Sequence, residues 1–473
     1  MFQRYKRHLS AGAAAGAAAA EETTTVPAPA APYSSGSAGQ SAPAPRPPAQ
    51  VARRDPEQER MLALKVAMHQ RLLDMLNLQA IEQASEESLR AEIAAIAREL
   101  LDLDGVVVTP ERFEVLVDDL YHEVVGLGPL EPLLQDETIS DILVTTHRSV
   151  YVERFGMLEP CPVRFKDEPH LMRVIDKIVR SVGRRVDEAQ PWVDARLPDG
   201  SRVNAMIPPC AVDGALLSIR KFSKQPYSVE RLVEIETLSP EIAAYLRKVV
   251  GSRLNVLVSG GTGSGKTTTL NALSSFIGDR ERIATIEDTA ELQLQQPHVA
   301  RMEARPPNVE GAGEITQRDL LKNALRMRPD RIIVGEVRGG EVLDMLQAMN
   351  TGHEGSMTTV HANSPRDALS RIENMVGMSG IDLPLRAVRT QMASAINVII
   401  QVQRMSDGRR RCVSVQELIG SLEGDTVSMQ EVFKFERSGV GADGGVRGAL
   451  TDTGLRSIYS NRFREWGVEA EAV

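Results

Sequence analysis

The sequence has few of the features that mark membrane-embedded, disulfide-rich or zinc-binding proteins. Aromatic residues make up only 4% of the 473 residues, and the three cysteines, Cys161, Cys210 and Cys412, are far apart. Cysteines without metal-ligand spacing indicate buried thiols in a reducing compartment. The sequence contains no run of about 18 apolar residues, the length that a membrane-spanning helix needs. We therefore expect membrane contact only through partner proteins.

The chain also lacks an excess of basic residues. Its formal net charge is -9 and its pI is near 5.6. A protein that moves along nucleic acid normally presents a basic surface, so we expect no nucleic-acid partner. A hydrophobic fraction of 42% and a charged fraction of 25% are ordinary for a globular protein. A chain of 473 residues exceeds the usual size of a single core, which predicts two or three domains.

The first 125 residues divide into a tail and a helical region. Residues 1–54 are rich in Ala, Pro, Ser and Gly, which predicts a disordered tail. The Ala/Gly run in this tail lacks Leu, Ile and Val, so we do not expect a secretory signal. Residues 55–125 carry apolar side chains at helical spacing, with helices starting near Pro56, Ser85 and Pro110. These three segments predict a small helical bundle.

The rest of the chain predicts an α/β fold in two parts and a short tail. Residues 126–225 contain short strand signals and one helix signal, which we interpret as a separate α/β domain. Residues 226–435 alternate strand and helix signals, which favours a parallel sheet with helices on both faces. Residues 436–473 begin with a glycine-rich stretch and are predicted to be a loose C-terminal tail.

The strongest motif is GGTGSGKT, which follows an apolar run and precedes a helix-compatible segment. It matches the P-loop pattern in the strand, loop and helix context that the pattern requires. Glycines let successive amide groups turn toward a phosphate, and the helix N-terminus favours negative charge. We expect ATP to be held by Gly260, Gly261, Thr262, Gly263, Ser264, Gly265, Lys266, Thr267 and Thr268.

Two residues of this loop and one further acid have more specific expected roles. Lys266 is expected to reach the β and γ oxygens, and the Thr267 hydroxyl to ligate Mg²⁺. Glu336 ends the apolar run IIVGE in the manner of a Walker B strand, although Gly335 stands where aspartate is usual. We expect Glu336 to hold Mg²⁺ through water.

Two carboxylates and two histidines are further candidates for the reaction. Glu287 and Glu291 follow an apolar strand, and either could polarise an attacking water, with a solvated loop as the alternative. His353 lies in a glycine-flanked turn and His361 at the end of an apolar strand. We interpret both histidines as sensors of the γ-phosphate, with hydrogen bonding inside the core as the alternative.

Together these motifs resemble those of the type II/IV secretion ATPases, whose Walker A, Asp box, Walker B and His box occur in this order. The segments are GGTGSGKT at 260, IEDTAEL at 286, IIVGEVRGGE at 332 and TGHEGSMTTVHANSP at 351. The chain is most similar to the CpaF-type tight-adherence (Flp/Tad) pilus ATPases, through MRPDRIIVGEVRGGEVLDMLQAMNTGH and PWVDARLPDGSRVNAMIPP. The likeness covers approximately residues 55–435.

This resemblance implies a RecA-like P-loop core with a parallel sheet, preceded by a small α/β domain and a helical bundle. It implies a homo-hexamer that hydrolyses ATP to drive assembly or retraction of a tight-adherence type IV pilus, a machine similar to type II secretion. The location it implies is cytoplasmic and peripheral at the inner membrane, under polytopic platform proteins. Some relatives carry a tetracysteine module that this sequence lacks, so no structural zinc is expected.

The resemblance also implies roles for individual residues. Glu291, with Glu287 nearby, matches the catalytic carboxylate, and Glu336, His353 and His361 match the Walker B and His box positions. Basic residues of the preceding domain match positions that reach nucleotide: Arg196, Arg202, Arg220 and Lys221. A cation that arrives with domain closure, such as that of Arg220, would stabilise charge on the transferring phosphoryl group. Ordinary surface ion pairs are the alternative for these residues.

Three other functions are compatible with part of the pattern. A VirB11-like ATPase for conjugation or effector secretion shares all four motifs. A nucleotide-switched scaffold would bind ATP without useful turnover. A nucleic-acid translocase would need a basic channel, which the net charge disfavours.

Overall fold

The computed structural model describes residues 85–222, 226–308, 311–441 and 444–468, together with Met68 and Arg71. The predicted disordered tail and most of the first predicted helix lie outside these residues. Met68 is helical and fully buried, and it belongs to the same hydrophobic cluster as the two helices that follow. The described residues contain no helix that is long and apolar enough to cross a lipid bilayer.

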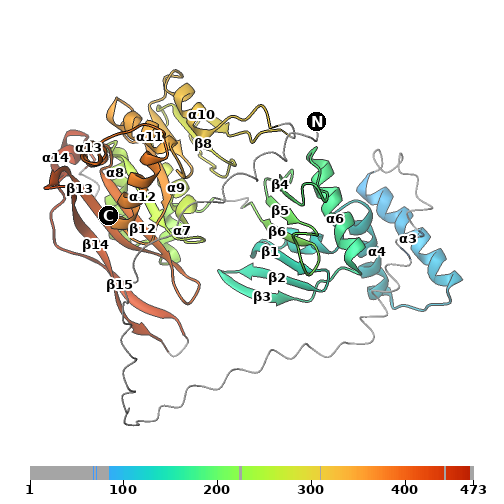
Figure 1. The fold of residues 1–473 in the computed structure, drawn as a ribbon. Helices are drawn as coiled ribbons and strands as arrows, with labels where there is room; N and C mark the ends of the chain where they lie inside the picture. Colours follow the sequence, from blue (N-terminus) through green and yellow to red (C-terminus); the bar gives the residue numbers. More distant parts are fainter. Residues whose placement is uncertain are drawn as a thin grey trace, which may run out of the picture. The chain divides into compact units, whose positions relative to one another are not determined.

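Two amphipathic helices begin at the predicted residues (Figure 1). Helix α3 spans Glu86–Leu103 and α4 spans Pro110–Val124. The hydroxyls of Ser85 and Thr109 accept backbone amides of the first turns, which satisfies donors that a helix N-terminus leaves unpaired. Leu89, Ile93 and Leu100 of α3 are buried and pack with residues of α4.

The next part of the chain is a six-stranded antiparallel sheet with one helix on its buried face. A short turn of η1 (Gly128–Leu130) and α5 (Glu131–Gln135) leads into the sheet, and α6 (Glu168–Ser181) packs on it. The strands are β1 (Ile139–Thr146), β2 (Ser149–Arg154), β3 (Met157–Cys161), β4 (Trp192–Arg196), β5 (Arg202–Met206) and β6 (Leu216–Arg220), in the order β3-β2-β1-β6-β5-β4. Buried and exposed residues alternate in β2 and β5, the pattern of a sheet covered on one face.

A nine-stranded sheet forms the larger part of the structure, in the order β15-β14-β13-β12-β7-β11-β10-β8-β9. The parallel strands are β7 (Val256–Gly260), β8 (Ile283–Glu287), β9 (Val299–Glu303), β10 (Arg331–Val334), β11 (Met357–His361) and β12 (Val398–Arg404). The antiparallel strands are β13 (Arg410–Glu423), β14 (Thr426–Val440) and β15 (Val446–Asp452). The α/β class is confirmed, and the predicted parallel sheet forms, but three antiparallel strands extend it into a mixed sheet.

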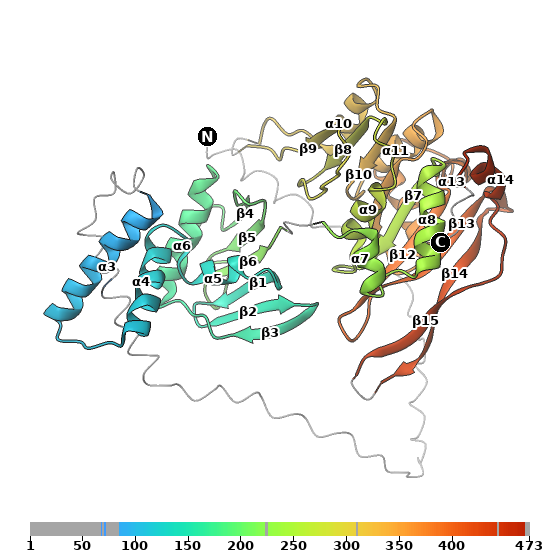
Figure 2. The same cartoon turned by 180° about the vertical axis from the view of Figure 1, so that it is seen from behind.

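Helices cover both faces of this sheet because its central strands are buried on both sides. In β7, Leu257 packs into one hydrophobic cluster while Val256 and Val258 pack into the other. The helices of the first cluster are α10 (Gln317–Ala324), α11 (Glu341–Asn350), α12 (Pro365–Gly377) and α13 (Leu385–Ala395). Those of the second are α7 (Val229–Glu234), α8 (Pro240–Gly251), α9 (Lys266–Ser274) and α14 (Ser460–Glu465). Figures 1 and 2 show the two helical layers from opposite sides.

The segment predicted to be a loose tail is instead largely ordered. Strand β14 continues to Val440, β15 pairs with it, and α14 packs Phe463 beside Tyr245. Val446 and Phe463 are buried, so this segment contributes apolar side chains to the core. Gly439 and Gly448 lie within the paired strands β14 and β15, and between these strands the Gly441 amide donates a hydrogen bond to the Gly445 carbonyl.

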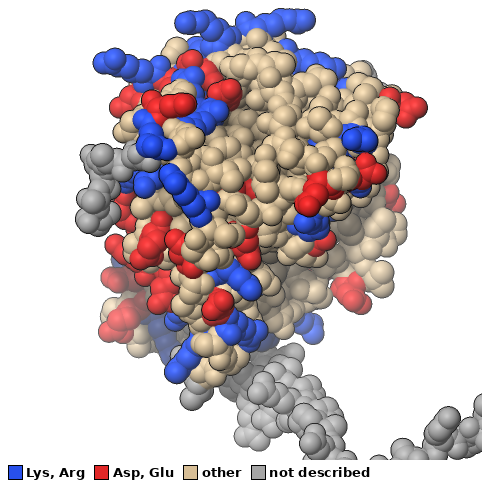
Figure 3. Space-filling view, turned by 90° about the vertical axis from the view of Figure 1, so that its left-hand side faces the viewer, with Lys and Arg blue, Asp and Glu red and all other residues tan. Residues whose placement is uncertain are grey.

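The register of the parallel strands brings their C-terminal ends to one edge. Gly260 of β7 lies opposite His361 of β11 and Val402 of β12, and Val334 of β10 lies opposite Ile286 of β8. Ligands of open α/β sheets bind at this carboxyl edge. On the face drawn in Figure 3, acidic and basic side chains are interspersed among uncharged residues, so neither sign of charge dominates that face.

Candidate functional site

The loop between β7 and α9 has the backbone geometry of a phosphate cradle. Gly263 and Gly265 have φ of +66° and +92°, a left-handed region that glycine adopts at little cost. A Cβ on Gly260 would lie 2.4 Å from the Ser264 hydroxyl and 2.5 Å from the Val402 carbonyl. Helix α9 begins at Lys266 without a side-chain cap, so its first amide groups point toward the loop. The sequence therefore needs glycine at each of these three positions.

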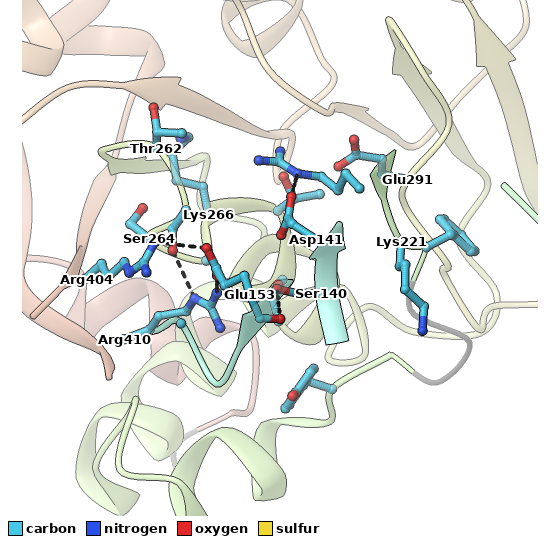
Figure 4. Close-up of a pocket in the computed structure, with 18 of the residues that line it drawn as sticks. Ser140, Asp141, Glu153, Lys221, Thr262, Ser264, Lys266, Glu291, Arg404 and Arg410 are labelled. Carbon is cyan, nitrogen blue, oxygen red and sulfur yellow. Dashed lines mark hydrogen bonds and ion pairs between the residues drawn. The ribbon is translucent and has the colours of Figure 1, made fainter. Parts of the chain in front are cut away.

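A cavity of about 1780 Å³ opens beside this loop (Figure 4). Residues 262–268 line it, together with Glu287, Glu291, Glu336 and His361. Gly260 and Gly261 precede the lining segment and shape the start of the loop. Ligand pockets of proteins commonly have volumes of ~300–1,000 Å³, so this cavity has room for a nucleoside triphosphate.

Lys266 is turned back onto its own loop. Its Nζ donates a hydrogen bond to the Gly261 carbonyl at 3.1 Å and lies 4.0 Å from Oε1 of Glu336. Burial lowers the pKa of Lys266, although the nearby Glu336 carboxylate acts in the opposite direction. An ammonium that is poorly hydrated and only loosely paired gains most from a new anionic partner.

Glu287 folds the acidic loop that follows β8. Its Oε2 accepts the backbone amides of Glu291 at 2.7 Å and Leu292 at 2.8 Å, while its Oε1 is buried with no hydrogen-bond partner. Burial raises the pKa of Glu287, and the two amides only partly offset this effect. A Cβ on Gly335 would lie 3.0 Å from Cγ of Glu287. The close approach of Glu287 explains why glycine precedes Glu336.

The other two carboxylates are each held by an arginine. Oε1 of Glu291 accepts a hydrogen bond at 2.9 Å from Arg202, which lies at the start of β5. Arg338 donates two hydrogen bonds to Oε2 of Glu336, at 2.6 and 2.9 Å, and lies 3.5 Å from Asp288. Arg338 belongs to the segment IIVGEVRGGE, but the sequence predicted no role for it.

The two predicted histidines occupy opposite ends of the same strand region. His361 ends β11 and lines the cavity, and burial followed by the nearby Lys266 charge lowers its pKa. His353 lies in the turn before β11, and its Nδ1 is buried without a partner. Because β11 runs for five residues between these two regions, His353 lies toward the edge opposite the phosphate loop. Only His361 joins the other site candidates.

Of the four predicted basic residues, three line the cavity. Arg220 donates to Asp141 at 3.2 Å, and the Nζ of Lys221 donates to the carbonyls of Leu133 and Asp136. Arg202 is the partner of Glu291 described above. Arg196 instead donates to Glu303 at 2.8 Å and to the Ala290 carbonyl at 2.9 Å, and is not among the lining residues.

Two arginines that the sequence analysis did not identify also reach the phosphate loop. Arg410 donates from Nε to the Gly263 carbonyl at 2.9 Å, and Arg404 lies on the adjacent strand. Both also donate to Glu153 of β2 (Figure 4). No motif marks these residues, because strand pairing rather than sequence proximity brings them to the loop.

The residues present suit a magnesium ion that is bound together with phosphates. The Thr267 hydroxyl and the Glu336 carboxylate line the same cavity, and both offer the hard oxygen atoms that Mg²⁺ prefers. Within the described part of the chain, no group of three or more His, Cys, Asp or Glu side chains is placed to hold a metal alone. Mg²⁺ is usually bound by one or two side chains together with substrate phosphates and water.

The loop, the helix after it and the carboxylates at neighbouring strand ends define a P-loop nucleotide-binding protein. The family model described as "Type II/IV secretion system protein" matches residues 123–447. The chain belongs to this family of secretion ATPases.

Two relatives are described as conjugation or secretion proteins. A candidate conjugal transfer protein of Mycobacterium tuberculosis is 43% identical over 305 residues, which cover 63% of this chain and 86% of that protein. The type IV secretion system protein VirB11 of Bartonella henselae is 31% identical, over 59% of this chain and 88% of that protein. The crystal structure of the VirB11 ATPase of Brucella suis matches 61% of this chain and 95% of its own, with 29% identity and a TM-score of 0.34.

Proposed function

We propose that this chain is the ATP-hydrolysing motor subunit of a secretion or pilus machine. The observation that carries the proposal is the shared cavity, in which a glycine-rich phosphate loop faces the carboxylates Glu287, Glu291 and Glu336. Phosphoryl transfer to water needs a cradle for the phosphates, a metal site and a group that orients the attacking water. Each of these has a candidate in this cavity.

The phosphate-binding roles fall to the loop and its lysine. The amide groups of residues 262–268 bind the phosphates, and Lys266 leaves the Gly261 carbonyl to reach the γ-phosphate. Thr267 and Glu336 would hold Mg²⁺, which would supply positive charge to the phosphate oxygens. Both Arg338 hydrogen bonds go to Oε2 of Glu336, which leaves Oε1 for a metal-bound water.

Glu291 is the better candidate for the group that polarises water. Oε2 of Glu287 is committed to two backbone amides, and burial raises its pKa, so Glu287 serves mainly to shape the loop. Glu291 is partly exposed to the cavity and has one partner, Arg202. Release of Arg202 would free the Glu291 carboxylate for water and the Arg202 guanidinium for phosphate. His361, neutral at pH 7 because its pKa is lowered, would hydrogen-bond near the γ-phosphate.

The working assembly that we propose is a homo-hexamer, peripheral to the cytoplasmic face of the inner membrane and bound to polytopic platform proteins. Domains of each subunit would close on ATP and release after hydrolysis, so that rotation of rigid parts is the mechanical output. The family relationship supports this assembly, and Arg202 and Arg220 of the six-stranded sheet lie in the same cavity as the phosphate loop.

Two machines fit such a motor. The segments around PWVDARLPDG and MRPDRIIVGE resemble tight-adherence pilus ATPases, which favours assembly or retraction of that pilus. The described functions of the M. tuberculosis and Bartonella relatives favour conjugal transfer or type IV secretion instead. Co-purification with pilus platform proteins would support the first machine, and co-purification with conjugation-channel proteins the second.

ATP turnover by the purified full-length chain tests the proposal directly. We expect Lys266→Ala to abolish hydrolysis, and Lys322→Ala, which removes an exposed lysine from α10, to leave it unchanged. Turnover in the Lys266→Ala variant at the rate of the parent would refute the site. Saturable ATP binding with no hydrolysis, even with platform-protein domains added, would favour a nucleotide-switched scaffold.

A further inference from the structure

The end of the β12–β13 hairpin lies beside the phosphate loop. Arg404 is the last residue of β12 and Arg410 the first of β13, and the two are directly opposite in the strand register. Side chains of directly opposed residues project from the same face of a sheet. Strand β12 pairs in parallel with β7, where Val402 lies opposite Gly260. The hairpin therefore extends past the end of β7 and brings both guanidinium groups to the loop.

Both arginines contact the loop at its left-handed glycines. Nε of Arg410 donates to the Gly263 carbonyl at 2.9 Å, and its Cδ lies 3.4 Å from the position that a Cβ on Gly265 would take. Nη1 of Arg404 lies 3.4 Å from the corresponding position on Gly263. A Cβ added at Gly263 or Gly265 would therefore contact one of the two arginines. The side chains of Arg404 and Arg410 thus lie beside the phosphate loop.

Glu153 of β2 is the shared partner of these arginines (Figure 4). Its Oε1 lies 3.4 Å from Nη2 of Arg410, and its Oε2 lies 3.4 Å from Nη1 of Arg404. Strong hydrogen bonds between a guanidinium and an anionic oxygen are ~2.7–2.9 Å long. Both bonds to Glu153 are thus longer than the best that these groups can form. Phosphate oxygens that approach more closely would replace this carboxylate.

The charge of the whole cavity favours such an exchange. Ten Lys and Arg residues line it, and ten Asp and Glu residues balance them. A balanced cavity offers little net attraction to a triphosphate unless some cations leave their carboxylates. Among the candidates for release, Arg404 and Arg410 are already placed at the loop.

We infer that Arg404 and Arg410 are phosphate-binding residues of the nucleotide site, and that Glu153 is a counterion which phosphate oxygens displace when nucleotide binds. This inference rests on the proposed function. The displacement occurs where two hairpins touch, because a Cβ on Gly156, after β2, would lie 2.5 Å from the Gly408 carbonyl, between β12 and β13. Nucleotide binding therefore breaks the ion pairs of Glu153 with Arg404 and Arg410 at the place where the two hairpins are in contact.

The test measures the Kd of a fluorescent ATP analogue with Mg²⁺ on the full-length chain. We expect Arg410→Met to raise the Kd by about tenfold, the effect of losing a charged hydrogen bond of about 1.4 kcal/mol. Glu153→Gln should lower the Kd by roughly threefold at low salt, because the arginines lose their competing anion. The Kd of Arg410→Met should also depend less on salt than that of the parent, which a purely structural role would not cause.

Matched controls remove the same charges outside the cavity. Arg437→Met on β14 and Glu159→Gln on β3 should bind the analogue as the parent does. A parental Kd in Arg410→Met, or weaker binding in Glu153→Gln, overturns the inference even if one of the variants folds poorly. If the parent shows no saturable binding that Lys266→Ala removes, the proposed function fails instead.

Discussion

Replacing Glu287 separates its structural role from a catalytic one. Its Oε2 accepts the amides of Glu291 and Leu292 at 2.7 and 2.8 Å. Alanine leaves both amides without this acceptor, and an unpaired buried donor costs about 1–3 kcal/mol, so Glu287→Ala should lose about 2–6 kcal/mol of stability. Glutamine keeps an oxygen of the same shape. Burial raises the pKa of Glu287, which means that its negative charge opposes folding, so Glu287→Gln should cost less than about 1 kcal/mol.

The same shift gives a pH signature. Between the ordinary pKa of 4.5 and the raised value in the folded protein, the folded state binds more protons than the unfolded state at Glu287. This group therefore makes the free energy of unfolding fall as pH rises through that window, and the contribution is fully present only below 4.5. Glu287→Gln should remove this part of the pH dependence.

Three measurements decide the role of Glu287. Thermal unfolding gives the stability, hydrogen exchange gives the protection of the amides of residues 291 and 292, and ATP turnover gives the activity. We expect Glu287→Gln to keep exchange protection and to retain turnover within about tenfold, whereas Glu291→Gln should lose about 10²–10³-fold, as removal of a general base does. If Glu287→Gln abolishes turnover while both amides stay protected, Glu287 is the chemical group and the assignment to Glu291 is wrong.

Three further predictions follow from individual side chains. Arg331 is buried and makes two 2.8 Å hydrogen bonds to Glu281, so Arg331→Met should lose about 3–5 kcal/mol in thermal unfolding, whereas Arg326→Met on the surface should lose little. Burial lowers the pKa of His361 in the folded protein from 6.5, so below pH 6.5 the unfolded state binds more protons at His361 than the folded state does. The free energy of unfolding therefore falls as the pH falls from 6.5 to the lowered pKa. His361→Gln should remove this part of the pH dependence of unfolding. His353→Gln should keep turnover within about threefold, because His353 does not line the cavity; a loss as large as that expected for Glu291→Gln would contradict this placement.

The sequence predicted best the features that depend on neighbouring residues. Ser85 and Thr109 start helices because their hydroxyls reach amides three residues ahead, a purely local interaction. The phosphate loop is equally local, because its curvature follows from glycine φ angles and from the helix that begins at Lys266. In both cases the relevant physics acts within a single turn of chain.

Features that depend on strand pairing were predicted poorly. Glycines between β14 and β15 suggested a loose tail, but Val446 is buried on a strand that pairs with β14, and Phe463 is buried beside Tyr245 of α8. A composition window cannot show this, since the stabilising partners lie elsewhere in the chain. The antiparallel strands that extend the parallel sheet were missed for the same reason.

The candidate site shows how local and long-range effects combine. Glycine at 335 looked like a departure from the usual acidic strand end, yet Cγ of Glu287 lies only 3.0 Å from the position that a Cβ at 335 would take. Glu287 ends β8, and Gly335 directly follows β10, which pairs with β8. The position of the Glu287 carboxylate therefore depends on the absence of a side chain at residue 335. A substitution that adds a Cβ at Gly335 would push Glu287 away and loosen the amides of Glu291 and Leu292 that it holds. The position of the proposed catalytic carboxylate is thus set partly by the absence of a side chain on a different strand, which a motif comparison at either segment alone would not reveal.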